Sequence, residues 1–445
     1  MFLLGTQRIN DRGHLEIGGC DTVDLARTYG TPLYVLDEAL IRANCRAFRQ
    51  AFGQRYPQVE IAYAGKAFLT TAMARIVAQE GLALDVASAG ELYTALRGGF
   101  PPERIFFHGN NKSPDELALA LAHGVGRIVV DNLYELDLLG RLAAETGRTA
   151  DILIRTAPGI DPHTHHRIRT GQADTKFGLS IADGAAMTAV KRALALPGVR
   201  LRGLHAHVGS QLLDTRAHEE AADIVLRFAR EVADETGYVI EELNLGGGLG
   251  IRYLPEHRPP TIDEFAEALV GAVRRALAAY NLPAPRLQLE PGRAIVGEAG
   301  TTLYTVGAIK RVSIPEPPGE RLYVTIDGGM SDNPRPQLYD AKYTALLANK
   351  ADRPAVVTAR IAGKHCETDI LIQSVPLAEP EPGDILAVLA TGAYNYSMAS
   401  NYNRFPRPAV VLVADGRAEV IVKRETLDDL LRQDVIPPRL WAAQP

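Results

Sequence analysis

Short runs of Val, Ile and Leu alternate with amphipathic, Ala- and Leu-rich stretches between Glu60 and Glu290. Such short apolar runs are typical of buried strands, and the stretches between them have the spacing of helices. The predicted strands are Glu60–Ala64, Ala83–Val86, Arg104–Phe107, Arg127–Val130, Asp151–Arg155, Arg200–His207, Ile240–Leu245 and Arg286–Leu289. The predicted helices are Thr71–Gln79, Ser88–Arg97, Ser113–Ala122, Asn132–Thr146, Arg216–Thr236 and Thr261–Tyr280. Because buried strands separated by helices form parallel sheets, we expect an α/β protein with a (β/α)8 TIM-like barrel.

The pattern changes after Glu290, where strand-like runs follow one another and turn residues replace the helices. The predicted strands are Thr301–Val312, Arg321–Ile326, Ala355–Ile361, Asp369–Ser374, Asp384–Leu389, Ala409–Val413 and Ala418–Val422, followed by a helix at Glu425–Arg432. This pattern predicts a C-terminal all-β domain, a β-sandwich or β-barrel. We therefore expect residues 31–290 to form the barrel. Residues 1–30 and 291–445 are expected to form a β domain that completes the active site.

Composition and charge narrow the class of protein. The 445 residues are 46% hydrophobic and 23% charged, which excludes a disordered chain. A formal net charge of −5 favours neither nucleic acid nor an anionic membrane as partner. The N-terminus turns polar too early for a signal peptide, and no apolar run is long enough to span a membrane, so we expect a cytoplasmic protein. Cys20, Cys45 and Cys366 lie too far apart for a disulfide framework or a zinc site.

Polar and glycine residues gather where the barrel strands end, which is where function lies in this type of fold. In chain order they are Lys66, His108, Asn110, Lys112, His207, Gly209, Ser210, Gly246, Gly247, Gly248, Glu290, Pro291, Gly292 and Arg293. The carboxyl ends of parallel strands meet on one rim, so these residues are expected to converge there.

Three of these positions each admit two interpretations. Gly246–Gly248 with Ser210 could bind a phosphate through backbone N–H groups, or could form a plain tight turn. A dinucleotide site is disfavoured, because Ile251 occupies the last glycine position of the G-x-G-x-x-G pattern.

Lys66 could form a Schiff base if its pKa is lowered by desolvation, or could be a solvated surface charge. Glu290 could stabilise a protonated pyridine ring, or could form a local ion pair with Arg293.

Two histidine groups raise the possibility of a metal site. His207 belongs to the sequence HAH, but no further ligands stand at a suitable spacing. His163, His165 and His166 cluster in a predicted loop beside Pro162, which favours a role other than metal binding. We expect no metal.

The second domain contains three unusual segments. GKHCETD carries Cys366 and Glu367, and the alternative for a lone cysteine is inert packing. DGGMSDNPRPQLYD carries Arg335 and Tyr339 and predicts a strand that leaves the core into an irregular loop. GAYNYSMASNYN carries Tyr394 and indicates either a polar contact surface or a solvated loop.

Taken together, these segments resemble the diaminopimelate decarboxylases, pyridoxal-phosphate enzymes built from an alanine-racemase-like barrel and a β domain. The similarity runs from about Thr31 to Arg407. The matching segments are YAGKAF, DVASAGEL, HGNNK, RTAPGIDPHTHHRIRTG, TKFG, GLHAHVGSQ, LNLGGGLGI, EPGR, DGGMSDNPRPQLYD, GKHCETD and GAYNYSMASNYN. The resemblance implies decarboxylation of meso-2,6-diaminopimelate to L-lysine and CO2, the last step of lysine biosynthesis.

The resemblance also implies how pyridoxal 5'-phosphate is bound. Lys66 would attach the cofactor as a Schiff base, and His207 would stack on its ring. Ser210 and Gly246–Gly248 would hold the phosphate, and Glu290 would pair with the pyridine nitrogen.

Further roles in this family concern the substrate. The residues implied are Arg293 near the phosphate and the substrate, Arg335, Tyr339 and Glu367 on the substrate, and Tyr394 on both cofactor and substrate. Cys366 is the best candidate to return a proton to carbon. Cys366 and Glu367 would come from the partner subunit, so the resemblance implies a homodimer with shared active sites. Arginine and glutamate together suit the ammonium and carboxylate at the far end of diaminopimelate.

Three departures and several alternatives stay open. Phe68 stands where many relatives carry Asn, RTAPG replaces a common RVNPG, and GKHCETD differs from a common ending in Glu-Ser-Gly-Asp. A related decarboxylase of ornithine, arginine or carboxynorspermidine is the main alternative. A non-catalytic cofactor-binding regulator would be expected to lack groups such as Lys66 or Cys366. A racemase of this type would carry arginine in the place of Glu290.

Overall fold

The computed structural model describes residues 2–160, 175–315 and 319–441. The chain divides into two units by its internal contacts. The barrel unit comprises residues 38–300 with short segments at 1–5 and 392–397, and the β unit comprises residues 6–37, 301–391 and 398–445. Residues 31–37 therefore lie in the β unit and residues 291–300 in the barrel unit, whereas the sequence placed each on the other side of its boundary.

In the part of the chain that the structure describes, eight parallel strands close into a barrel. They are β5 (Val59–Ala64), β6 (Ala83–Val86), β7 (Ile105–Phe107), β8 (Arg127–Val130), β9 (Ala150–Ala157), β11 (Val199–Ala206), β12 (Glu242–Asn244) and β13 (Arg286–Leu289). Each pairs in parallel with the next, and β13 pairs with β5 to complete the ring. The short β10 (Leu179–Ser180) adds to β9 on the outside of this ring. The predicted TIM-like barrel and its eight strands are confirmed.

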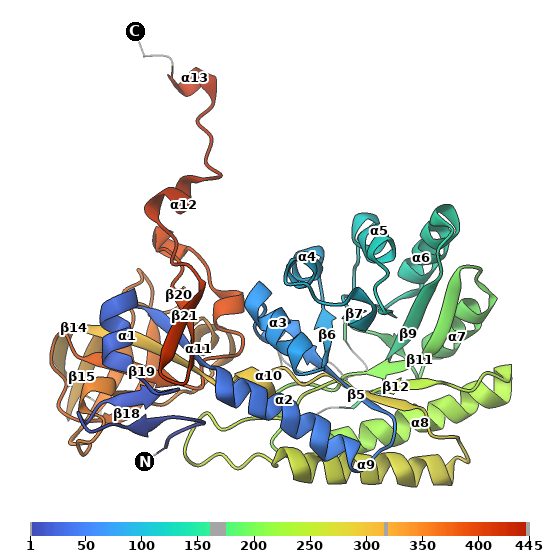
Figure 1. Cartoon of the computed structure of the whole chain (residues 1–445), viewed down its shortest axis with the longest axis horizontal. Coiled ribbons are helices and arrows are strands. Elements are labelled where there is room, and N and C mark those ends of the chain that lie inside the picture. The colour runs from blue at the N-terminus through green and yellow to red at the C-terminus, as the bar shows by residue number, and fades with distance from the viewer. Residues whose placement is uncertain (1, 161–174, 316–318, 442–445) are drawn as a thin grey trace. The chain divides into compact units, whose positions relative to one another are not determined.

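Helices surround the barrel strands, as Figure 1 shows. They are α2 (Glu38–Gly53), α3 (Thr71–Gln79), α4 (Ala89–Arg97), α5 (Pro114–His123), α6 (Leu133–Thr146), α7 (Ala185–Ala195), α8 (Arg216–Thr236), α9 (Ile262–Ala279) and the short α10 (Arg293–Val296). Ser88, Ser113, Asn132 and Thr261 cap their helices by accepting a backbone N–H of the first turn, which is why these helices begin where the sequence predicted. The sequence missed α2 and α7.

The described residues of the β unit form two sheets. A small sheet holds β1 (Arg8–Ile9), β2 (Leu15–Ile17) and β3 (Cys20–Asp21). The strands of the larger sheet are β4 (Leu33–Asp37), β14 (Gly300–Ile314), β15 (Gly319–Ile326), β16 (Ala345–Leu347), β17 (Val357–Ala362), β18 (Ile370–Leu377), β19 (Ile385–Leu389), β20 (Ala409–Ala414) and β21 (Arg417–Val422). N-terminal β4 pairs with C-terminal β20, so the N-terminal segment joins the β unit.

The helices of the β unit include one correction to the sequence analysis. They are α1 (Thr22–Tyr29), α11 (Arg335–Tyr339), α12 (Leu427–Leu431) and α13 (Pro438–Trp441). A strand that leads into an irregular loop was predicted here, and the loop prediction is wrong for Arg335–Tyr339, which form a short helix. Pro334 and Pro336 fix φ in the helical range, which lets this turn start without the usual N–H donors.

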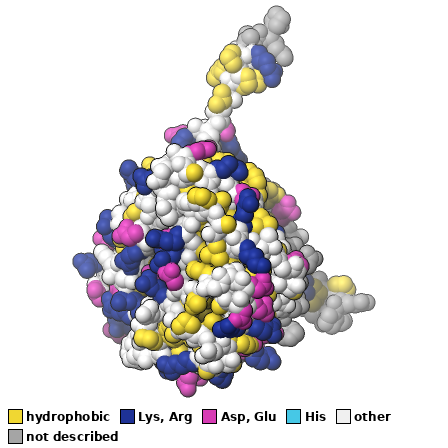
Figure 2. Space-filling model, turned by 90° about the vertical axis from the view of Figure 1, so that its right-hand side faces the viewer, with side chains coloured by type: hydrophobic (Ala, Val, Ile, Leu, Met, Phe, Trp, Pro, Cys, Tyr) yellow, Lys and Arg dark blue, Asp and Glu magenta, His cyan; other side chains and the backbone are white. Residues whose placement is uncertain are grey.

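The surface agrees with the mild net charge. Figure 2 shows acidic and basic side chains interspersed with apolar ones on the face that it presents, rather than a field of one sign. Among the described helices, none is long and apolar enough to cross a membrane.

Candidate active site

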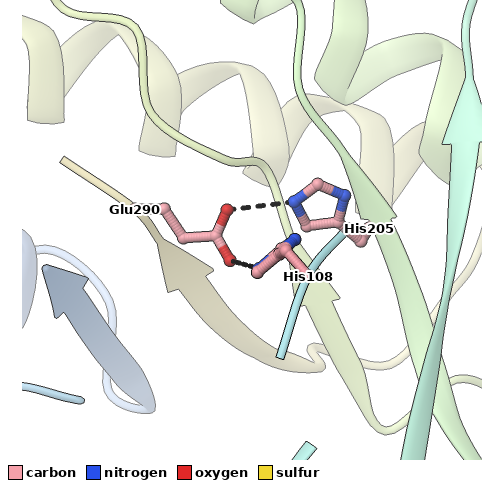
Figure 3. A group of neighbouring side chains, drawn as sticks. All are labelled: His108, His205 and Glu290. Carbon is pink, nitrogen blue, oxygen red and sulfur yellow. Dashed lines mark hydrogen bonds and ion pairs between the residues drawn. The ribbon is translucent and has the colours of Figure 1, made fainter. Parts of the chain in front are cut away.

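A buried carboxylate, Glu290, follows β13 at the carboxyl-end rim of the barrel. Its Oε1 accepts hydrogen bonds from Nε2 of His108 at 2.8 Å and from Nδ2 of Asn244 at 2.7 Å. Its Oε2 accepts from Nε2 of His205 at 3.0 Å. Figure 3 shows the two imidazoles reaching the two oxygens of this carboxylate. We refer to Glu290, His108, His205 and Asn244 as the Glu290 cluster.

The amide of Asn244 has a defined orientation in this cluster. Its Oδ1 accepts the backbone N–H of Gly246 at 2.8 Å, so Nδ2 must point toward Glu290. A carboxylate has about four acceptor positions, and the cluster fills three of them. One acceptor position, on Oε2, therefore has no donor from the described residues.

Burial and hydrogen bonding act in opposite directions on these groups. Burial alone would raise the pKa of Glu290, but its interactions with His108 and His205 outweigh this, and the pKa lies well below its usual range. Burial lowers the pKa of His205 to about 4, so near neutral pH this ring is uncharged. Glu290 is thus an ionised carboxylate in the interior, stabilised by N–H donors.

His108, His205 and Glu290 also lie close enough together to hold a metal ion. A metal-bound His205 would carry its proton on Nδ1, where a metal-ligating histidine ordinarily donates to a second group. Nδ1 of His205 is buried without a partner in the described part of the chain. The ring is therefore better matched to donating from Nε2 to Glu290 than to binding a metal, and the absence of a metal stays a prediction.

The loop after β12 places three glycines against the neighbouring strand ends. A Cβ atom on Gly247 would lie 2.1 Å from the backbone oxygen of Glu290, and one on Gly248 would lie 2.5 Å from that of Gly209. Gly246 and Gly248 have φ angles of +68° and +125°. The N–H of Gly246 is donated to Asn244 and that of Gly247 to Nδ1 of His207, at 3.3 Å. Close packing thus already requires these glycines, so the tight-turn interpretation holds whether or not the loop also binds a phosphate.

His207 directly follows β11 at the carboxyl-end rim of the barrel, and its ring is neutral. Because Gly247 donates to its Nδ1, the proton of the neutral ring belongs on Nε2. Burial, and then the positive charges of Lys66 and Arg155, hold the pKa of His207 well below its ordinary value. A half-buried, uncharged imidazole can stack on a flat ring without adding charge.

Lys66 lies in the single 3-10 turn Gly65–Ala67 that follows β5. The side chain is exposed, and its charge influences buried Asp85 as well as His207. The neighbouring Phe68 is buried and packs edge-on against Tyr396, with ring centroids 5.7 Å apart. The short turn therefore presents the amine toward the ionisable groups of the rim while Phe68 anchors it.

Arg293 and Ser210 form a hydrogen-bonded pair apart from the Glu290 cluster. Nη2 and Nε of Arg293 donate to Oγ of Ser210 at 3.0 and 3.4 Å, and Nη1 donates to the hydroxyl of Tyr253. The guanidinium also lies 4.7 Å from the centre of the Tyr394 ring. Glu290 and Arg293 thus have separate partners, and the local ion pair between them is not formed among the described residues.

Tyr394 has an unusual backbone. Its φ is +61°, a conformation that non-glycine residues rarely adopt. The N–H of Tyr394 donates to the carbonyl oxygen of Ala67 at 2.8 Å, and Oγ of Ser397 donates to the same oxygen at 3.1 Å. Backbone strain of this kind often marks a functional site. Here the hydrogen bonds fix the backbone of Tyr394 beside Ala67, the residue that follows Lys66.

The β unit contains the remaining predicted residues. Arg335 is buried on α11 and donates to the hydroxyl of Tyr343 at 2.6 Å, and Tyr339 lies half-buried at the end of the same helix. Cys366 is exposed whereas Cys20 and Cys45 are buried, so inert packing does not explain it. Glu367 is exposed and accepts a hydrogen bond from Tyr402 at 2.7 Å.

Comparison with known proteins decides the family. The model of the pyridoxal-dependent decarboxylase, pyridoxal-binding domain, matches residues 38–297. A diaminopimelate decarboxylase of Bacillus subtilis is 50% identical over 98% of both chains, and one of Mycobacterium tuberculosis is 47% identical over 95% of both. The chain belongs to the diaminopimelate decarboxylase family.

The fold agrees with this family. A diaminopimelate decarboxylase of M. jannaschii, solved in complex with L-lysine, superposes with a TM-score of 0.91 at 37% identity, over 99% of this chain and 100% of that one. Diaminopimelate decarboxylases use pyridoxal phosphate.

The barrel unit fits that cofactor on its own geometry. The open acceptor position of Glu290 suits a protonated pyridine nitrogen, which is an N–H donor. Neutral His207 supplies a flat ring, and Lys66 supplies an amine on the same rim. Arg293 and Ser210 supply a cation and a hydroxyl for anionic groups. The donor set of this diaminopimelate decarboxylase family member therefore matches the chemistry of pyridoxal phosphate.

Sequence reasoning missed several residues of the site. Asp85, Arg155, His205 and Asn244 lie within the barrel strands rather than after them, and all are buried. The available signal was a polar residue inside an otherwise apolar run, as in LNL and ALDV. His163, His165 and His166 lie outside the described residues.

Proposed function

We propose that this chain uses pyridoxal phosphate to remove one carboxylate of meso-diaminopimelate, giving L-lysine and carbon dioxide. The observation that carries the residue assignments is the buried, ionised Glu290 with one acceptor position open. When bound, pyridoxal phosphate supplies a conjugated ring that withdraws the electron pair left on carbon when carbon dioxide departs. Glu290 keeps the ring nitrogen protonated through a charge-assisted hydrogen bond. Lys66 holds the cofactor between turnovers.

Other groups of the barrel unit orient the bound molecules. His207 packs against the ring face, and its lack of charge avoids competition with the ring for electrons. Ser210, Arg293 and the glycine loop hold the phosphate and a carboxylate, and Tyr394 contacts cofactor and substrate. These roles rest on the neutral state of His207, the Arg293–Ser210 hydrogen bonds and the position of Tyr394 beside Ala67.

Cys366 returns the proton in this proposal. The C–C bond to the departing carboxylate breaks, and its electron pair stays with the carbon. The S–H bond of Cys366 then breaks, and its proton joins that electron pair to form the new C–H bond. The thiolate regains a proton from water. An exposed thiol in a turn can meet a substrate, which supports this role.

A direct assay tests the reaction. Purified protein with pyridoxal phosphate should release one CO2 per L-lysine from meso-diaminopimelate. A panel with ornithine, arginine and carboxynorspermidine serves as the comparison. If one of these compounds is turned over faster than diaminopimelate, that compound is the substrate. If neither diaminopimelate nor any compound of the panel is turned over, a non-catalytic cofactor-binding protein is favoured.

Arg335 is expected to bind the distal carboxylate of the substrate. Arg335→Ala should lower kcat/KM for diaminopimelate about 100-fold or more, because a charged hydrogen-bonded pair is lost. The bound-cofactor absorbance should stay unchanged. Tyr343→Phe, which removes the hydroxyl that Arg335 contacts but keeps the charge, is the matched control and should cost far less. Unchanged turnover by Arg335→Ala would refute the role.

The complete site is proposed to form in a homodimer, with Cys366 and Glu367 reaching the partner's cofactor. Support comes from the family resemblance and from the exposure of both residues in the single chain. Mixing inactive Lys66→Ala and Cys366→Ala proteins under subunit exchange should restore about a quarter of wild-type activity if sites are shared between subunits. Failure of the mixture to regain activity, with exchange verified, would contradict sharing. The unpaired cysteines also support the proposed cytoplasmic location.

A further inference from the structure

The turn between β17 and β18 carries Cys366 and Glu367, and a buried carboxylate lies at its base. Oδ2 of Asp369 accepts a hydrogen bond from Nδ1 of His365 at 2.5 Å, and Oδ1 accepts the backbone N–H of Met330 at 2.9 Å. The side chains of His365 and Asp369 are 0% and 2% exposed. One carboxylate thus joins this turn to the loop that leads into Arg335.

Both neighbouring segments leave room for this carboxylate. A Cβ atom on Gly329 would lie 2.0 Å from Oδ2 of Asp369, and one on Gly363 would lie 1.9 Å from it. The backbone N–H of Lys364 also donates to the carbonyl oxygen of Gly328 at 3.1 Å. Two glycines at closest approach indicate that the position of Asp369 is fixed by packing on two sides.

The ring of His365 connects the buried carboxylate of Asp369 to the residues that contact the exposed part of the turn. It lies parallel to Tyr402 with centroids 6.0 Å apart, and edge-on to Phe405 at 5.1 Å. Tyr402 in turn donates to Glu367, and Oδ1 of Asn403 accepts the backbone N–H of Cys366 at 3.0 Å. His365 therefore packs against the segment that holds both proposed active-site residues.

We propose that Asp369 and His365 are positioning residues that place the thiol of Cys366 for proton return. The inference rests on the proposed role of Cys366. A donor must come within hydrogen-bond reach of the carbon, and an error of about 1 Å can cost roughly 100-fold in rate. The buried pair removes the freedom that an exposed turn would otherwise have.

Substitution of Asp369 tests the pair, because backbone N–H groups donate to both of its oxygens: that of Met330 to Oδ1 and that of His365 to Oδ2 at 3.4 Å. Whichever way the amide of Asn points, its NH2 group meets one of these two N–H groups. Asp369→Asn and His365→Leu should each lower kcat about 10- to 100-fold and raise the solvent deuterium isotope effect on kcat, as proton return becomes limiting. His365→Asn places an amide nitrogen near the position of Nδ1 and should recover most of kcat.

Two controls separate positioning from general loss of stability. Asp384→Asn removes another buried carboxylate of the β unit, which accepts from Lys350, Asn349 and the backbone of Glu381, and none of these lies in the 363–369 turn. It should lower the melting temperature but leave kcat and the isotope effect unchanged. Bound-cofactor absorbance should be unchanged in every variant.

The outcomes distinguish this inference from the proposed function. If Cys366→Ala keeps wild-type kcat, the proton-donor role fails and the inference fails with it. If Cys366→Ala is impaired but Asp369→Asn and His365→Leu keep kcat and the isotope effect, only the inference is overturned. If Asp369→Asn does not fold, equal kcat for His365→Leu and His365→Asn would also overturn it.

Discussion

Lys66→Ala should abolish the visible absorbance of attached cofactor and reduce kcat roughly 10³-fold or more. Lys112 also follows a barrel strand, but its amine donates to Glu135 and to the carbonyl oxygens of Gly109 and Val129, so it is not expected to replace Lys66. Borohydride reduction of the wild-type protein should fix the cofactor to Lys66, as shown by mass spectrometry of the digested protein.

A surface lysine provides the control for this experiment. Lys191→Ala removes an exposed amine on α7 that pairs with Glu235, and should keep both absorbance and activity. A reduced cofactor adduct on any lysine other than Lys66 in the wild-type protein would overturn the assignment. Retention of attached cofactor in Lys66→Ala would do the same.

Glu290→Gln should lower kcat about 10²- to 10³-fold while the cofactor stays attached to Lys66. The variant has nearly the same shape but no negative charge. Its amide NH2 would also face one of the N–H donors of the Glu290 cluster. The ring nitrogen of the cofactor then loses its negatively charged partner, so its pKa should fall. It should therefore lose its proton at a lower pH than in the wild type. A pH titration of the bound-cofactor spectrum measures this shift.

Glu242→Gln is the matched control for Glu290. Glu242 is also a buried barrel carboxylate, but it begins β12 and pairs with Arg127 through Nε at 2.7 Å. Glu242 therefore lies at the amino-terminal end of the barrel strands, whereas Glu290 lies at their carboxyl end. The control should lose stability and keep its cofactor spectrum. If Glu290→Gln shows wild-type kcat and an unshifted spectral titration, Glu290 does not serve the ring nitrogen.

The order of elements was predictable because the local signals agree. Most barrel strands lie in short, mainly apolar runs, and polar caps such as Ser113 and Thr261 mark where helices start. The strand ends also identified Lys66, His207 and Glu290 as candidates, since parallel strands place their carboxyl ends on one rim. Helix α2 was missed, because Glu38–Gly53 directly follows a strand of the other unit.

The sequence by itself therefore determined the barrel and the chemistry of its strand ends, because both follow from local periodicity. Only the tertiary structure showed what surrounds Glu290. His108 lies 182 positions before it and Asn244 lies 46 positions before it, yet closure of the ring brings both within hydrogen-bond distance. Likewise, the N–H of Met330 reaches Asp369, 39 positions further along the chain, because Gly329 and Gly363 let the two backbone segments approach. Contacts of this kind depend on which strands become neighbours in the folded chain, and no local pattern encodes that.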